Sequence, residues 1–115
     1  WIDKVATDLP DLKVVAVHGG WPWTVEMMAV AWRHQNVYVE ISGVRPRYLL
    51  KPGSGWEPLL NYGASVLQDR ILWGSNWPQL DPAEGLETLA QFPLKPAVLA
   101  KWLGDNAAAL LAIGR

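Results

Sequence analysis

Three short apolar runs rich in β-branched residues are spaced along the chain, and each is followed by a segment with helical periodicity. The runs cover residues 12–18, 37–42 and 70–75. The first shows no clean alternation of apolar and polar residues, which is typical of a parallel strand covered on both faces. Strands that alternate with helices predict an α/β fold with a parallel sheet and right-handed crossovers.

Helix signals occupy the segments around these runs. Thr24 is predicted as a helix N-cap, and Asp81 as a second one, because short polar side chains accept the free amide hydrogens of a first turn. Pro82 follows Asp81 at the first helical position, where proline is well tolerated. We expect a long loop at residues 43–55, and loops of that length are often functional. The predicted helices cover residues 1–9, 24–34, 57–62, 82–90, 96–103 and 105–112.

Composition excludes several classes of protein. The chain has 115 residues, no cysteine and a net charge of −1. One modest domain fits this length, and neither a disulfide scaffold nor a thiolate metal site is available. The charge predicts no nucleic-acid or anionic-membrane partner. No apolar run reaches the ~20 residues of a membrane helix. The lack of cysteine fits a cytoplasmic location.

Tryptophan is unusually frequent, with eight residues in the chain. We expect most of them to pack the core, because they lie beside apolar periodic segments. The alternative is a binding module in which tryptophans stack on a sugar or aromatic substrate. Trp21 follows the Gly-Gly pair after the first strand and is the candidate substrate-binding tryptophan.

Four motifs occur in an order and spacing that resemble the ACMSD-like metal-dependent amidohydrolases, also called the amidohydrolase-related or family 2 group. They are Val17-His-Gly-Gly-Trp-Pro-Trp23, residues 36–43, Asp69-Arg-Ile-Leu-Trp-Gly-Ser-Asn-Trp-Pro78 and residues 105–111. The resemblance identifies the first three with the sixth, seventh and eighth strand regions and the last with the closing helix. It implies that residues 1–115 form one partial domain: the C-terminal three βα units of a (β/α)₈ TIM barrel plus closing helices.

Three strands do not close such a barrel, which needs eight strands over ~250 residues. Helices on one side would leave the other sheet face and both sheet edges uncovered. We therefore expect the chain to be part of a larger protein or to assemble with other copies or another chain, as an oligomer rather than a stable monomer.

The resemblance also assigns chemistry to His18 and Asn76. Family members hold zinc, sometimes manganese, with histidines of earlier strands and an aspartate of the eighth; that aspartate position is Asn76 here. The resemblance makes His18 the acid/base residue and Asn76 the metal-side residue, with weak or absent metal binding by this chain alone. The alternatives are a His18 imidazole bonded to a neighbouring carbonyl, and an Asn76 amide that caps the turn before Pro78.

Three further polar positions accompany this pair. Arg45 and Arg47 are candidates to clamp a substrate carboxylate, because a guanidinium binds carboxylates through two hydrogen bonds. The alternative for both is a solvated or subunit-contacting loop. Glu40 shares the polar phase of the second strand with Ser42, and we expect it to form a structural ion pair.

The leading function is therefore the C-terminal part of a metal-dependent hydrolase. It would act on a carboxylated or carbonyl small molecule, hydrolysing an ester, lactone or amide through metal-activated water. A non-oxidative decarboxylase of the same family is the first alternative. A non-catalytic fragment or degenerate relative is the second, because asparagine replaces the expected aspartate.

Overall fold

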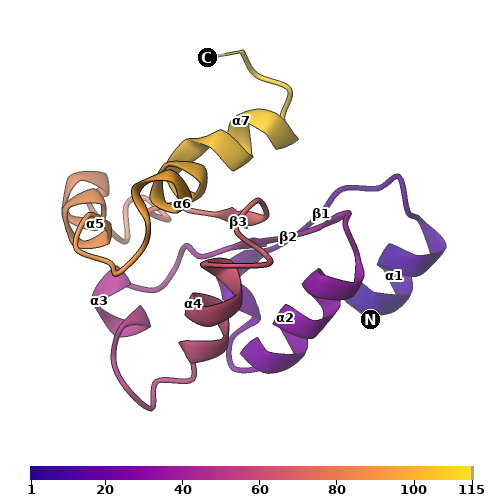
Figure 1. Cartoon of the computed structure of the whole chain (residues 1–115), viewed down its shortest axis with the longest axis horizontal. Helices are drawn as coiled ribbons and strands as arrows, with labels where there is room; N and C mark the ends of the chain where they lie inside the picture. The colour runs from indigo at the N-terminus through magenta and orange to yellow at the C-terminus, as the bar shows by residue number, and fades with distance from the viewer. Residues whose placement is uncertain (115) are drawn as a thin grey trace.

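The computed structural model describes residues 1–114 and contains one parallel sheet in the order β1–β2–β3, flanked by helices (Figure 1). This confirms the predicted α/β class. The strands are β1 (Val14–Ala16), β2 (Val37–Glu40) and β3 (Ile71–Leu72). The helices are α1 (Ile2–Asp8), α2 (Thr24–Arg33), α3 (Pro46–Leu49), α4 (Glu57–Gly63), α5 (Pro82–Leu89), α6 (Pro96–Ala100) and α7 (Asn106–Leu110).

All three strands are shorter than predicted because the chain turns away from the ladder early. After β1, a tight turn occupies Val17–Gly20. After β3, the Trp73 amide donates to the Trp102 carbonyl at 3.0 Å instead of continuing the sheet. Strand pairing depends on a partner elsewhere in the chain, so the apolar run alone overestimates strand length.

The helices also depart from prediction at three places, the first being the short helix α3 inside the predicted loop 43–55. Thr24 is the first residue of α2 rather than its N-cap, and its hydroxyl donates to the Gly55 carbonyl. Helix α6 runs through a π turn at Lys101–Asp105 directly into α7, so the helix does not restart at Asp105 as predicted. The Asp81 N-cap is confirmed, since its carboxylate accepts from the Ala83 amide at 2.8 Å.

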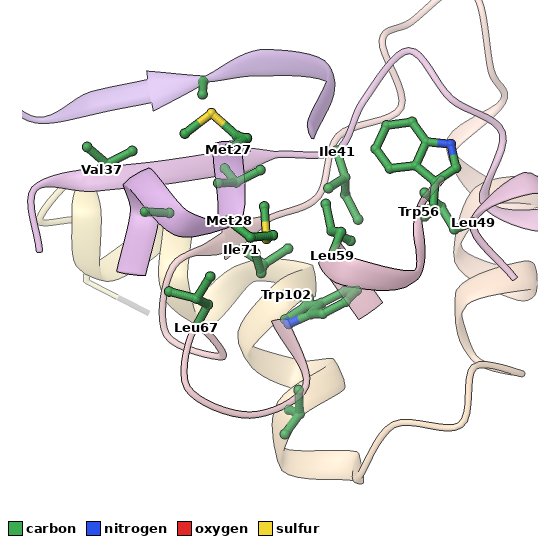
Figure 2. Close-up of a cluster of buried hydrophobic side chains, with 14 of the residues drawn as sticks. Met27, Met28, Val37, Ile41, Leu49, Trp56, Leu59, Leu67, Ile71 and Trp102 are labelled. Atoms are coloured by element: carbon green, nitrogen blue, oxygen red, sulfur yellow. The ribbon is translucent and has the colours of Figure 1, made fainter. Parts of the chain in front are cut away.

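The core lies between one face of the sheet and the helices beside it. Val37, Val39 and Ile71 point toward this face and are fully buried. Helices α2 and α4, which lie side by side in Figure 1, cover it with Met28 and Leu59 among others. Figure 2 shows these side chains as one cluster that extends from Val37 to Trp56.

The opposite face of the sheet is poorly covered along β1 and β2, although Leu72 of β3, the register partner of Glu40, is buried. Val15 is 40% exposed, and Tyr38, its partner in the strand register, is only half-buried. Glu40, the next residue of β2 on this face, is also half-buried. The expectation that only one sheet face is covered therefore agrees with the burial pattern of β1 and β2 but not with that of β3.

The tryptophans do not follow the core-packing prediction. Trp56 and Trp102 are buried, but five of the eight are exposed: Trp1, Trp21, Trp23, Trp32 and Trp77. The prediction is wrong for these five because it was based on their apolar neighbours along the chain. Residues from other segments of the chain do not cover their side chains.

No helix in residues 1–114 combines the length and apolarity needed to cross a bilayer.

Two buried asparagines connect the helices to the sheet. The Asn36 amide group donates to the carbonyls of Leu9 and Leu12, and so holds the segment between α1 and β1. The Asn106 amide group donates to the Ile71 carbonyl at 2.7 Å, which ties α7 to β3. Each amide group is buried, and these bonds give its donors the partners that burial requires.

Candidate functional site

The two residues singled out by the motifs lie at the same edge of the sheet. The strands are parallel, so their carboxyl ends meet there, and His18 follows β1 while Asn76 follows β3. Both side chains are exposed, and both residues adopt a left-handed backbone, with φ of 58° and 55°. Histidine and asparagine adopt this conformation more readily than most residues, and such positions are concentrated at functional sites.

A hydrogen-bond chain sets the orientation of His18. Its Nδ1 lies 2.8 Å from the Ser42 carbonyl oxygen, and because a carbonyl only accepts, Nδ1 carries the proton. When the ring is neutral, Nε2 is therefore the nitrogen without a proton. Ser42 is held in turn by Glu40, which accepts from the Ser42 amide at 2.8 Å and from its hydroxyl at 2.7 Å. The sequence predicted an ion pair for Glu40, whereas its partner is the neutral Ser42.

Two glycines leave the space that this arrangement needs. A Cβ on Gly43 would lie 2.5 Å from Nδ1 of His18, and Gly43 has a φ of +77°. A Cβ on Gly74 would lie 2.6 Å from Oε1 of Glu40. Real Cβ contacts of this length do not occur, so both positions require glycine for His18 and Glu40 to stay where they are.

Asn76 is connected to the same hydrogen-bond system through Gln79. The Asn76 amide donates to the Gln79 side-chain oxygen at 2.5 Å, and the Gln79 side-chain nitrogen donates to the Gly43 carbonyl at 3.2 Å. Gln79 also donates its backbone amide to the Asn76 carbonyl, which closes the turn around Pro78. The ends of all three strands are thus linked, from His18 through residues 42–43 to Asn76.

The three predicted substrate contacts have different surroundings. Arg45 forms an exposed ion pair with Glu84 of α5 at 3.1 Å. The Arg47 guanidinium lies 5.1 Å from the centre of the Tyr48 ring. Trp21 lines a groove of about 540 Å³ whose wall includes Gly43, the residue in contact with His18.

This groove, the Trp21 groove from here on, also exposes residues that the sequence interpretation missed. Tyr48 and Lys51 line it, whereas neither Arg45 nor Arg47 is among its lining residues. The sequence did contain a signal that Tyr48 and Lys51 could be functional, because both lie in the same basic loop as the two arginines. The sequence alone does not tell which side chains of a loop lie closest to a groove. Here the short helix α3 determines which of them reach it.

The residues of this chain do not by themselves fit a metal ion. Within residues 1–114 there is no group of three or more His, Asp or Glu side chains placed to hold one. Asn76 supplies only a neutral carbonyl oxygen, which offsets no metal charge. His18 and Asn76 therefore provide at most two positions, and a complete metal site requires further ligands.

Comparisons with known proteins agree with this architecture. The family model described as Amidohydrolase matches residues 2–113. The crystal structure of an uncharacterized TIM-barrel protein from Bordetella bronchiseptica superposes with a TM-score of 0.84 at 38% sequence identity. The superposition covers 97% of this chain but only 38% of that protein, as expected for part of a barrel. No curated protein matches the sequence.

Proposed function

Because the chain belongs to the amidohydrolase family, we propose that it supplies the closing edge of a hydrolase active site, with His18 as the acid/base residue. The substrate is a carboxylated or carbonyl small molecule, and the reaction is hydrolysis of an ester, lactone or amide. Within the family, the ACMSD-like group is the subgroup we favour. The other barrel strands come from residues outside this chain.

The observation that carries the proposal is the oriented imidazole. The Ser42 carbonyl fixes the protonated nitrogen at Nδ1 and leaves Nε2 able to accept a proton. His18 is exposed at the carboxyl end of a parallel strand, the end at which TIM-barrel enzymes place their catalytic residues. Glu40 acts through Ser42 and is a positioning residue.

Asn76 has a different role in the proposal. Its amide cannot serve as a base near neutral pH, so we assign it to orienting the turn through Gln79 and presenting a carbonyl oxygen to the site. A metal requirement, with zinc as the first candidate, is a proposal about the complete barrel and not about this chain. No step assigned to His18 depends on it.

The test compares two histidine variants in the protein that carries these residues together with the remaining barrel strands. His18→Gln should lower kcat for ester, lactone or amide hydrolysis by about 10²–10⁴-fold, the usual contribution of a general acid/base. His34→Gln is the matched control. His34 follows the C-terminal end of α2, whereas His18 precedes the N-terminal end, and the His34 imidazole bonds to Asp3 of α1. Equal activity of the two variants would refute the role of His18.

A second measurement separates the alternatives. Decarboxylation of a carboxylated substrate in place of hydrolysis would support the lyase alternative. If neither the natural sequence nor Asn76→Asp turns over any substrate or gains bound metal, the chain belongs to a non-catalytic relative.

A further inference from the structure

The side of α2 that faces away from the sheet exposes large apolar side chains. Val25 is 62% exposed and Trp32 is 56% exposed. Trp32 contacts Tyr62 of the neighbouring helix α4, with 5.5 Å between the ring centres, and Tyr62 is itself 40% exposed. Apolar side chains that are exposed together, unlike single ones, mark interaction surfaces.

This side of α2 stays open when further strands are added to the sheet. The helix packs on the sheet side through Met28 and Ala31, which are buried. In a (β/α)₈ barrel the helices form the outer ring, and further strands would extend the sheet beside β1 and β3. The segments that complete the barrel therefore do not cover the outward side of α2.

The outward side of α2 also carries two opposite charges. Glu26 and Arg33 are both exposed and seven residues apart, which places them on one face of the helix. Arg33 forms an exposed ion pair with Asp3 at 3.2 Å through Nη1, so the other nitrogens of its guanidinium can still donate. Within residues 1–114, Glu26 has no ion-pair partner.

The charged pair and the apolar pair share a midpoint on the helix. Val25 and Trp32 are also seven residues apart, and both pairs are centred near Ala29, a small exposed residue. A second α2 that lies antiparallel across Ala29 would place Glu26 of each copy beside Arg33 of the other. The same twofold axis would place Val25 of each copy beside Trp32 of the other. A symmetric dimer contact requires this kind of self-complementarity.

We propose that the outward side of α2 is a homodimer contact, in which α2 of one copy packs antiparallel on α2 of a second copy. Ala29 lies at the crossing point, where a small side chain lets helix axes approach to about 8 Å. The Glu26–Arg33 pairs form on one flank of the crossing, and the Val25–Trp32 contacts form on the other. The contact is separate from the open sheet face and does not depend on the function proposed for His18.

A single introduced cysteine can report this contact, because the chain contains none. Ala29→Cys should give a disulfide-linked dimer under mild oxidation, since the two Cα atoms at the crossing point would lie within the roughly 4.4–6.8 Å that a disulfide spans. Ala100→Cys, at an exposed alanine of α6, is the matched control and should remain monomeric on a non-reducing gel. Equal cross-linking of the two variants, or none in Ala29→Cys, would overturn the proposal.

Sedimentation equilibrium of the full chain at low salt tests the charged flank. Glu26→Arg should raise the dimer Kd about tenfold, because both symmetric pairs would then oppose like charges. Combining Glu26→Arg with Arg33→Glu should restore the original Kd. Glu87→Arg, a charge reversal at an exposed position of α5, should leave the Kd unchanged.

Three results of this experiment would refute the α2 contact. They are a chain that stays monomeric at all concentrations, a Kd that Glu26→Arg does not change, and a Kd that the double variant does not restore. Association with an unchanged Kd in Glu26→Arg would assign the dimer to another surface, such as the open sheet face. None of these measurements involves catalysis, so their failure leaves the acid/base role of His18 untouched.

Discussion

The contact between Gly43 and His18 allows a direct test of how the imidazole is held. Gly43→Ala places a Cβ 2.5 Å from Nδ1, so the ring must rotate away and lose its bond to the Ser42 carbonyl. The left-handed backbone costs alanine about 1–2 kcal/mol. The lost hydrogen bond adds about 1 kcal/mol, for a total of about 2–3 kcal/mol.

Gly53→Ala is a matched control that measures only the free-energy cost of placing alanine in a left-handed backbone. Gly53 has a φ of +72°, close to that of Gly43, but a Cβ there would meet no atom within 4 Å. We therefore expect it to cost about 1–2 kcal/mol without moving His18.

Urea unfolding of the two variants gives the free energies, and ¹⁵N NMR of the imidazole gives the tautomer. Gly43→Ala should shift His18 away from the pure Nδ1–H form, and Gly53→Ala should not. If both variants lose the same stability and keep the same His18 tautomer, the reasoning about this contact is wrong.

The other predictions concern the loop and the sheet. Backbone hydrogen bonds lower the pKa of Glu57 below its ordinary value of 4.5, so the stabilisation from its ionised carboxylate is present above that value and is lost as the pH falls through the lowered pKa. The protection factor of the Gly53 amide in hydrogen exchange should therefore fall in that acidic window, and Glu57→Gln should remove the pH dependence of this factor. Asn106→Ala should destabilise the fold by about 2 kcal/mol, because the buried Ile71 carbonyl loses its donor. Asn61→Ala, at an exposed position of α4, should change the urea midpoint little, and an equal effect of both would contradict this account.

Local features of the sequence determined the alternation of strands and helices. β-branched runs, the Asp81 cap and the prolines at helix starts act within a few residues, so the order of elements follows from the sequence. The same features predicted that His18 and Asn76 follow parallel strands, and hence that they share one edge of the sheet.

Only the tertiary structure decided the partners of these residues. That Ser42 orients His18, that Gln79 links Asn76 to Gly43, and that Lys51 rather than an arginine lines the groove all depend on contacts between distant segments. The exposure of most tryptophans has the same origin. Burial and hydrogen bonding between strand ends are set by the packing of whole elements, and the local pattern of residues contains no measure of that packing.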